Sequence, residues 1–355
     1  MLYELGRFSN LALFREQRDL LKGNDLQLLV KSKFEAGLKI AGTNGNRPKV
    51  ALILACQQNF DQIASCIDWD IPRTEGEVES FPGNFAASTQ YALLKTGQDI
   101  PKNYELTNTS EWWKIIKDVL TSEVSRKIFS ENFWRSPMIV RPRRGLPLQH
   151  ILPFIFGDKP IIGVDLGAGL HVALPLLNSE AYQRGIQNLN LDYRPIDIQT
   201  GFGIDKQPRE LEWAIASEGP GSNARSNVDE LIKSYHLAVQ MVDSFPFISA
   251  SVFDVTTHIR NPVDFAFSSF LRHQLGTATE IQNLFRTVVG RLVKENGVWI
   301  DIGKEYVQPP NDRLYSGYDV DVYRIKNGTP LLIGTPFVLE GNQVDIQRVN
   351  TDFFK

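Results

Sequence analysis

The chain has 355 residues, of which 42% are hydrophobic, 22% charged and 10% aromatic. This composition is that of a globular protein with a substantial apolar core and excludes intrinsic disorder, and the length favours two moderate domains over one large domain. The formal charge of −3 argues against a general attraction to nucleic acid or to an anionic membrane, since both partners favour a basic surface.

The amino-terminal segment lacks the uninterrupted apolar core of a signal peptide, because Glu4, Arg7 and Arg15 interrupt it. No stretch has the roughly 18 uncharged apolar residues of a membrane span. The two cysteines, Cys56 and Cys66, lack the companions that a tetrahedral metal site needs. We therefore expect reduced thiols in a cytoplasmic protein that has neither a metal centre nor a membrane span.

Apolar side chains recur at three- and four-residue spacings through the first 140 residues, which predicts a mainly helical region. The expected helices cover 8–22, 26–40, 84–96 and 110–130. Ser110 is the expected cap of the last one, and 48–67 fits either a buried helix or a strand followed by a helix. Three prolines and three arginines within 136–147 then indicate a connector. We place a helical amino-terminal domain over 1–145 and an α/β domain over 146–355.

Short apolar runs alternate with amphipathic segments in the second domain. Strands are predicted at 161–167, 194–205, 245–254, 264–270 and 297–303, and helices at 226–242 and 277–294. The stretch 169–177 has helix-like content, although Pro175 would limit or kink it. A hairpin about Asn327-Gly328 occupies 319–337.

Alternation of strands and helices implies parallel strands joined by right-handed crossovers, with ligands at the carboxyl ends of the strands. The predicted fold class is therefore α/β, with a Rossmann-like, mostly parallel sheet that ends in an antiparallel hairpin and follows a mainly helical region. Asp165, Asp205 and Asp254 stand at the ends of three predicted strands. Gly167 and Gly169 follow the first of these acids, so we expect a ligand near this turn.

The glycine turn is a poor match to a dinucleotide site. In a GxGxxG turn the third small residue lets the helix pack close to the strand, and Val172 occupies that place here. Asp165 would also lie beside the doubly charged pyrophosphate, which its carboxylate would repel. These two features disfavour NAD and FAD.

The segment VDLGAG, residues 164–169, resembles the first motif of class I S-adenosylmethionine-dependent methyltransferases. That motif is an apolar strand, an acid and Gly-x-Gly. The resemblance extends over about half the chain, roughly 160–337, since the later strands follow in the family's order. The layout with a helical amino-terminal region also resembles that of prokaryotic proteins with a methyltransferase-like domain.

The resemblance implies S-adenosylmethionine as the cofactor. Asp205 is similar to the acid that receives both ribose hydroxyls, and Asp254 to the acid that accepts from the adenine amino group. The cofactor-binding residues implied in this way are Asp165, Gly167, Ala168, Gly169, Asp205, Phe253 and Asp254. This sequence departs from the family in the long gap between Gly169 and Asp205, which implies an insertion around 178–200. It also lacks an Asn-Pro-Pro-Tyr type motif, so nucleic-acid bases are not indicated as acceptors.

Candidates for contact with the acceptor are fewer. His258 and His273 follow the third and fourth predicted strands, and either could deprotonate an acceptor, because histidine changes charge near neutral pH. His171 could face the pocket or be a packed side chain. Arg141 and Arg144 could bind an acceptor carboxylate or phosphate, or be part of a solvated linker.

The sequence thus predicts an S-adenosylmethionine-dependent methyltransferase that acts on an acceptor which the sequence does not name, with a small molecule favoured. The alternative is a Rossmann-like domain without catalytic activity that serves as a binding or interaction module. A long gap before Asp205 and His171 in place of a small residue favour the alternative. The oligomeric state is not predicted.

Overall fold

The structure is a computed structural model that describes residues 20–43, 45–73, 78, 83–98, 104–221, 223–271, 275, 278–303, 317–340 and 345–355. The chain forms two compact units, which are described separately below. The helical unit comprises Gln17–Val140 and Glu210–Ile232, and the α/β unit comprises Arg141–Arg209 and Lys233–Lys355. Residues 210–232 follow a strand of the α/β unit in sequence but pack within the helical unit.

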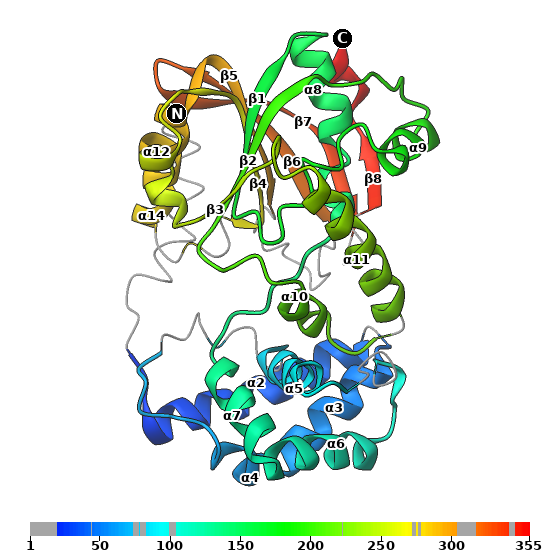
Figure 1. The fold of residues 1–355 in the computed structure, drawn as a ribbon, viewed down its shortest axis with the longest axis vertical. Coiled ribbons are helices and arrows are strands. Elements are labelled where there is room, and N and C mark those ends of the chain that lie inside the picture. The colour runs from blue at the N-terminus through cyan, green and yellow to red at the C-terminus, as the bar shows by residue number, and fades with distance from the viewer. Residues whose placement is uncertain are drawn as a thin grey trace. The chain divides into compact units, whose positions relative to one another are not determined.

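Short amphipathic helices build the helical unit (Figure 1). They are α2 (Gly23–Thr43), α3 (Arg47–Gln58), α4 (Phe60–Ala64), α5 (Gly83–Lys95), α6 (Thr109–Thr121), α7 (Glu123–Asn132), α10 (Leu211–Ser217) and the first part of α11 (Ala224–Gln240). The predicted helices 26–40, 84–96 and 226–242 are confirmed. The prediction for 8–22 lies almost wholly outside the described residues.

The prediction of one helix over 110–130 is wrong, because Ser122 ends α6 and caps α7. The Ser122 side chain accepts from the Ser125 N–H, and its extended backbone breaks the helix. The cap of α6 is Asn108 rather than Ser110, since the Asn108 side chain accepts from the Ser110 N–H at 2.9 Å. Residues 48–67 are helical, which excludes the alternative with a strand.

Aromatic rings fill the core of the helical unit. Phe85 on α5 packs against Phe129 and Phe133 with ring centroids 5.6 and 5.5 Å apart, and against Phe34 on α2 at 6.2 Å. All four rings are fully buried. Burying such side chains stabilises the unit by roughly 2–3 kcal/mol each before the entropic costs of folding.

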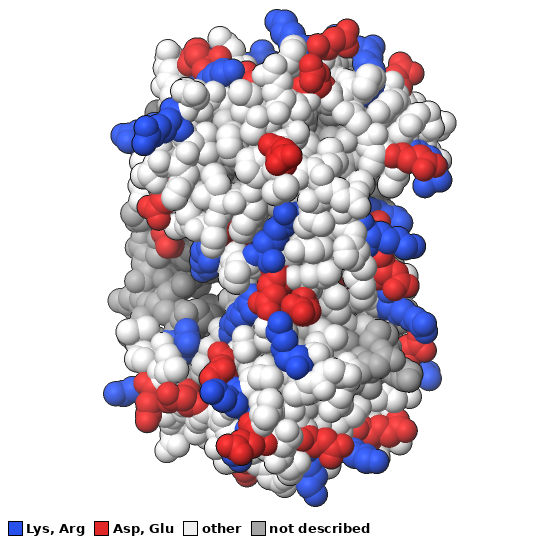
Figure 2. All heavy atoms as spheres, in the orientation of Figure 1, with Lys and Arg blue, Asp and Glu red and all other residues white. Residues whose placement is uncertain are grey.

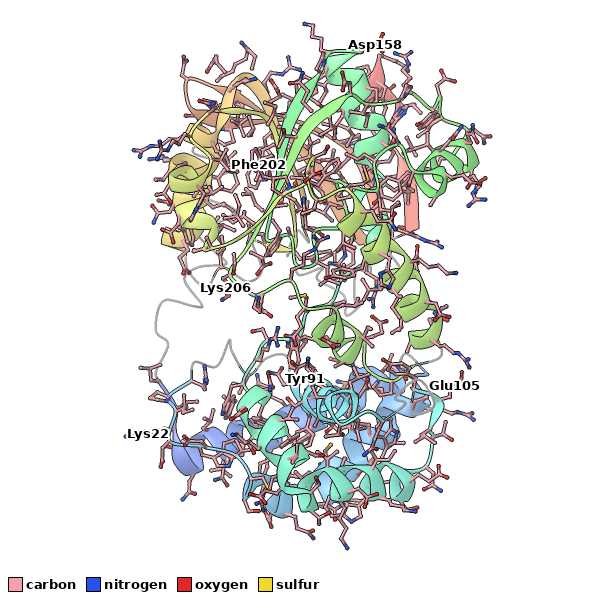
Figure 3. The ribbon with its side chains drawn as sticks, in the orientation of Figure 1. Lys22, Tyr91, Glu105, Asp158, Phe202 and Lys206 are labelled. Atoms are coloured by element: carbon pink, nitrogen blue, oxygen red, sulfur yellow. The ribbon has the colours of Figure 1, made fainter. Side chains whose placement is uncertain are left out.

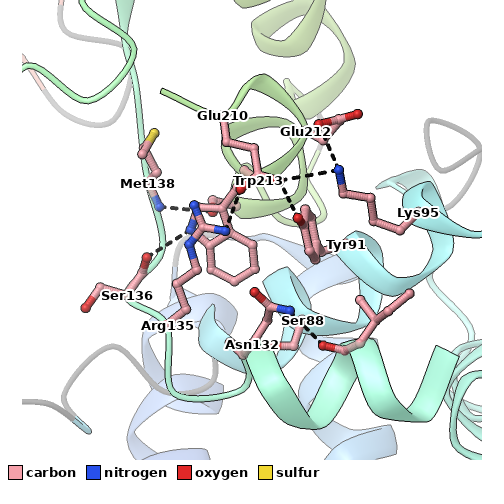
Figure 4. Close-up of polar contacts among 12 residues, drawn as sticks. Ser88, Tyr91, Lys95, Asn132, Arg135, Ser136, Met138, Glu210, Glu212 and Trp213 are labelled. Atoms are coloured by element: carbon pink, nitrogen blue, oxygen red, sulfur yellow. Dashed lines mark hydrogen bonds and ion pairs between the residues drawn. The ribbon is translucent and has the colours of Figure 1, made fainter. Parts of the chain in front are cut away.

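Glu210 fastens residues 210–217 to α5 within the helical unit (Figure 4). Its carboxylate accepts from the Tyr91 hydroxyl and from Arg135 Nη1 at 2.7 Å, and Lys95 Nζ lies 3.4 Å away. The Arg135 guanidinium also stacks on the Trp213 ring at 4.4 Å, and the Trp213 indole donates to the Ser136 carbonyl. Burial acts to raise the pKa of Glu210, but these donors hold it below the ordinary value.

One sheet organises the α/β unit. Its strands are β1 (Ile161–Leu166), β2 (Ile198–Asp205), β3 (Phe247–Ser249), β4 (Val263–Ser269), β5 (Val293–Gly303), β6 (Gly317–Lys326), β7 (Thr329–Glu340) and β8 (Asp345–Val349). Their order is β3-β2-β1-β4-β5-β6-β7-β8. The first five are parallel and the last three antiparallel. The predicted α/β class, with a mostly parallel sheet followed by an antiparallel hairpin, is confirmed.

Helices and short helical turns connect the strands. They are α8 (Leu148–Phe156), α9 (Glu180–Asn188), α12 (Val255–His258), α14 (Ala278–Asn283) and α15 (Gly290–Leu292), with a π-helical stretch at Leu284–Val289 and 3₁₀ turns at Pro142–Gly145, Val252–Asp254 and Thr351–Phe354. In Figure 1, α12 and α14 lie on one side of the sheet and α9 on the other. No helix of the described residues is both long and apolar enough to cross a membrane.

Side-chain alternation along β1 gives the sheet two different faces. Val164 and Leu166 join a core with residues of α12 and α15, such as Val255 and Leu292. Because successive side chains point to opposite faces, Asp165 lies on the other face. Its neighbour across β2 is Gly203 and across β4 is Phe267. The Asp165 side chain thus lies on the face of the sheet opposite to this apolar core.

Three predicted elements of the α/β unit differ from the structure. The strand predicted at 245–254 is only Phe247–Ser249, because Ser251 caps a 3₁₀ turn over Val252–Asp254. The helix predicted at 277–294 ends at Leu292, and β5 starts at Val293 instead of Gly297. The helix-like stretch after β1 contains turns and no helix.

Candidate functional site

The turn after β1 stays irregular because several of its residues have left-handed backbone angles. Gly167 and Gly169 have φ of 74° and 54°, and His171 has φ of 50°. Such angles favour glycine and interrupt a right-handed helix. No helix N-terminus therefore points at the turn, in contrast to a dinucleotide site.

Backbone N–H groups of the turn are used within the protein. The N–H groups of Gly167 and Ala168 both donate to the Ile204 carbonyl, at 2.9 and 3.0 Å. The Gly169 N–H donates to Asp205 Oδ2 at 2.9 Å. The turn is thus tied to the end of β2, and these three groups are already paired and do not form a cradle for phosphate.

Asp205 joins the two strand ends. Besides the Gly169 N–H, its carboxylate accepts from the Gln207 N–H at 2.8 Å through Oδ1. A carboxylate has about four lone-pair sites, so each oxygen retains the capacity to accept one more hydrogen bond. The side chain is half-buried, and Lys206, labelled in Figure 3, follows it directly. Asp205 can therefore receive hydroxyl donors from a ligand.

Asp165 is withdrawn from solvent, with 4% of the residue exposed. Its Oδ2 lies 3.8 Å from Nδ1 of His171, longer than a hydrogen bond. Burial raises the pKa of Asp165, and the negative charge of Asp205 adds to the rise, whereas the His171 imidazole opposes it. The pair of acids at the strand ends thus concentrates negative charge beside the glycine turn.

His171 is fully buried, with its Nε2 2.9 Å from the Gly201 carbonyl oxygen. Its ring occupies the space above Gly203, where a Cβ would overlap the imidazole. The Phe245 ring packs beside it, with centroids 6.3 Å apart. The interpretation of His171 as an acceptor-binding residue has no support in this conformation, because the ring fills the space that Gly203 leaves over β2.

Arg209 fixes the other end of the turn. Its Nε donates to the Leu170 carbonyl at 2.8 Å, and its guanidinium stacks on the Tyr235 ring at 5.1 Å. Burial lowers the pKa of Arg209. This role of Arg209 was not predicted from sequence, because no local pattern marks a contact between residues 39 positions apart.

The end of β3 carries the third acid. The Ala250 N–H donates to the Asp205 carbonyl at 3.0 Å, which holds the chain leaving β3 against the end of β2. Asp254 follows on the 3₁₀ turn with an exposed side chain, and Phe253 is half-buried against the core on the α12 side of the sheet. The structure thus brings Asp165 and Asp205 together at the glycine turn, with Asp254 further along an adjoining segment.

The end of β4 borders the turn on its other side. A Cβ at Gly167 would lie 3.2 Å from Leu271 Cδ1, so these two residues are in close contact. Phe270, just before Leu271, supports the Arg144 guanidinium at 4.2 Å and packs against Tyr318 at 4.6 Å. Arg144 is half-buried and Arg141 likewise. Arg144 is therefore close to the strand end next to the turn.

The two candidate bases are not brought to the turn by the described contacts. His258 ends α12 with an exposed side chain. His273 lies outside the described residues. Within the described ranges, no group of three His, Cys, Asp or Glu side chains could hold a metal ion.

No protein-family model matches the sequence, and comparison with curated proteins finds no match. Similar solved structures include the rRNA methyltransferase aviRa from Streptomyces viridochromogenes (11% identity, TM-score 0.31, covering 54% of this chain and 87% of that one). Others are a precorrin-6y C5,15-methyltransferase from Geobacter metallireducens (12%, 0.23, 44% and 61%) and an S-adenosylmethionine-dependent methyltransferase from Geobacter sulfurreducens with S-adenosylhomocysteine (16%, 0.26, 50% and 55%). This chain spans less than two thirds of the last two.

Because these structures have low identity and low TM-scores to this chain, its fold is identified from the topology of its sheet. The order β3-β2-β1-β4-β5 with parallel pairing is that of a doubly wound sheet, and the glycine turn lies between β1 and the carboxyl end of β2. The α/β unit therefore has a Rossmann-like, doubly wound fold.

Proposed function

We propose that the α/β unit binds S-adenosylmethionine at the glycine turn and transfers its methyl group to a small-molecule acceptor. The observation that carries the proposal is the polarity of the turn. Its N–H groups at Gly167, Ala168 and Gly169 are paired internally, while the Asp205 oxygens keep acceptor capacity. Such a site binds ligands that donate hydrogen bonds and carry positive charge, and it disfavours pyrophosphate.

S-adenosylmethionine has the matching groups. Its ribose hydroxyls can donate to Asp205, and its ammonium group is attracted by the charge of Asp165 and Asp205. Gly167 and Gly169 have no side chain to block the approach of the amino-acid moiety. Asp254 and Phe253, on the segment beyond β3, are the proposed contacts of the adenine. The residues present therefore fit this cofactor better than NAD or FAD.

When bound, the cofactor would supply an electrophilic methyl group. The chain's own residues would orient the donor, exclude water and position the acceptor, which is how such transfers are accelerated without many dedicated catalytic groups. Arg144, held on Phe270 beside the turn, is the proposed contact for an acceptor carboxylate or phosphate. His258 remains a proposed base for which the structure gives no further support.

A small-molecule acceptor is favoured over nucleic acid by the charge distribution. On the face that Figure 2 shows, Lys and Arg are interspersed with Asp and Glu, without a broad basic region among the residues drawn in colour. Nucleic-acid-binding proteins place a basic patch along their contact surface. The free thiols Cys56 and Cys66 fit the proposed cytoplasmic location.

Isothermal titration calorimetry of the purified chain tests the proposal. We expect heat of binding with S-adenosylmethionine and with S-adenosylhomocysteine, and none with NADH. Binding of NADH alone would identify a nicotinamide protein. A folded chain that binds none of the three would favour the alternative of a Rossmann-like interaction module.

A further inference from the structure

A buried pair of ionisable groups, Asp165 and His171, lies beneath the glycine turn, and His171 has no role in the proposed binding site. Asp165 is 4% exposed and His171 is fully buried. Nδ1 of His171 faces Oδ2 of Asp165 at 3.8 Å and has no hydrogen-bond partner among the described residues. Two ionisable groups buried this close together strongly influence each other's protonation.

The Gly201 carbonyl fixes the tautomer of His171. A carbonyl oxygen only accepts, so Nε2 at 2.9 Å must carry a proton and donate it. Nδ1 is then either bare or, in the imidazolium, protonated. A bare Nδ1 facing an ionised Asp165 would place two acceptors against each other away from water, which is unfavourable. One proton between the two groups removes this conflict, whichever of them holds it.

Among the described residues, few other charged groups lie near this pair. Asp205 approaches from the end of β2, and its negative charge favours retention of the proton. Arg209 donates to the Leu170 carbonyl, and its guanidinium stacks on the Tyr235 ring. The Phe245 ring covers His171 on the remaining side. Burial also raises the pKa of Asp165, which further favours a retained proton.

We propose that Asp165 and His171 share a single proton, and that loss of this proton makes the site prefer a cationic ligand over a neutral one. The inference rests on the proposed function for the identity of the ligands. With the proton the pair has no net charge, and without it the pair has a charge of minus one. His171 is then a positioning residue that controls the charge presented by Asp165.

The two forms of the cofactor differ in charge. S-adenosylmethionine carries a sulfonium that S-adenosylhomocysteine lacks, so the donor has one more positive charge than the product. Deprotonation of the pair stabilises the donor more than the product. The preference for donor over product therefore increases as pH rises through the titration of the pair. A shift of one pH unit in that titration on binding corresponds to a preference change of about tenfold.

The test compares wild type with His171→Asn by calorimetry with both ligands, between about pH 6 and pH 9. Asparagine tolerates the left-handed backbone at this position and offers an amide to Asp165 that does not titrate. Ionisation of the ligands themselves affects both proteins equally. The difference between the two pH profiles therefore reports the protonation of Asp165 and His171. We expect the ratio of the two dissociation constants to change about tenfold more with pH in wild type than in His171→Asn. Identical pH profiles in two proteins that bind would overturn the proposal.

A second measurement needs no cofactor and no His171 variant. ¹⁵N NMR of the imidazole nitrogens in wild type and in Asp165→Asn reports the tautomer and the titration of His171. We expect Nε2 to be protonated in both proteins and the Nδ1 signal to differ between them, because Asp165→Asn removes the group that shares the proton. A bare Nε2, or an Nδ1 signal that does not depend on Asp165, would overturn the shared proton. If NMR shows the shared proton but neither ligand binds, the proposed function is wrong and the shared proton between Asp165 and His171 is still established.

Discussion

Glu210 in the helical unit and Asp165 in the α/β unit are both acids withdrawn from water, yet their surroundings are opposite. Glu210 accepts from Tyr91 and Arg135 and has Lys95 at 3.4 Å. Among the described residues, Asp165 has the His171 imidazole at 3.8 Å and the negative charge of Asp205 nearby. One acid is surrounded by donors, and the other lies beside a second acid.

The pKa directions express this difference. Burial acts to raise the pKa of both acids, but hydrogen bonds from Tyr91 and Arg135 hold the pKa of Glu210 below its ordinary value, whereas the pKa of Asp165 is raised. A buried carboxylate that accepts several hydrogen bonds stabilises the folded protein. A buried carboxylate without such donors destabilises it, and binding of a cationic ligand offsets this cost. We infer that Glu210 serves structure and that the acids of the glycine turn serve binding.

The largest effect that the comparison predicts is on ligand affinity at Asp205. Asp205→Ala removes the acceptor proposed for the ribose and leaves the Gly169 N–H unpaired, so we expect the dissociation constant of S-adenosylmethionine to rise by about 100-fold. Calorimetry gives this constant. Asp197→Ala, an exposed acid just before the opposite end of β2, is the matched control and should bind as wild type. Equal affinities of the two variants would place the ligand elsewhere.

The next effect is on stability at Glu210. Glu210→Gln leaves the Arg135 guanidinium without its anionic partner, so we expect the free energy of unfolding to fall by about 2 kcal/mol. Urea unfolding followed by Trp fluorescence measures the loss. Glu212→Gln, whose side chain is 52% exposed and pairs with the same Lys95, should change stability little. A loss of cofactor binding by folded Glu210→Gln would contradict the inference that Glu210 serves structure and the acids of the glycine turn serve binding.

The sign of the pH effect at Glu210 follows from its lowered pKa. The stabilisation is fully present above the ordinary value of 4.5 and is lost as pH falls through the lower folded value. Wild type should therefore lose more stability than Glu210→Gln when acidified below that ordinary value. Parallel losses in the two proteins would mean that the donors around Glu210 do not stabilise its charged form.

A somewhat smaller effect is expected at Gly203. A methyl group there would overlap the His171 ring, so Gly203→Ala should displace the imidazole from Asp165 and cost roughly 1–2 kcal/mol of stability. Thermal unfolding of the folded variant measures it. Gly42→Ala, at a helical position with nothing near the added atom, should not destabilise. A Gly203→Ala protein as stable as wild type would show that the slot is not filled as described.

The smallest effect concerns Asp254. Its exposed side chain can offer one solvent-screened hydrogen bond to the adenine, so Asp254→Ala should weaken binding by roughly three- to tenfold. Calorimetry under the conditions used for Asp205→Ala makes the two comparable. A loss as large as that of Asp205→Ala would require Asp254 to move to the glycine turn on binding.

The positions of β1 and β4 could be predicted from sequence because each contains a short apolar run, whereas β8 was not predicted. β1 and β4 were found within one residue of their observed bounds. The prediction failed after β1, where composition suggested a helix. The left-handed backbone at His171 interrupts that segment, and the position of its ring depends on the space left by Gly203 in another strand. Local sequence carries no trace of such a contact.

The site was predictable only in part, for the same reason. Asp165, Gly167 and Asp205 stand at strand ends, and the parallel order brings them together. The burial of His171 and the hydrogen bond from Arg209 to the Leu170 carbonyl depend on tertiary contacts, which the local sequence does not indicate. The inclusion of residues 210–232 in the helical unit is likewise set by the partners of Glu210 and Trp213, which lie on α5 and on the segment that follows α7.

A crystal structure of the chain with S-adenosylhomocysteine would show whether the ligand binds at the glycine turn. We expect both ribose hydroxyls within hydrogen-bonding distance of the Asp205 carboxylate and the amino-acid moiety over Gly167 and Gly169. A ligand bound elsewhere, or one whose ribose does not touch Asp205, would contradict this expectation.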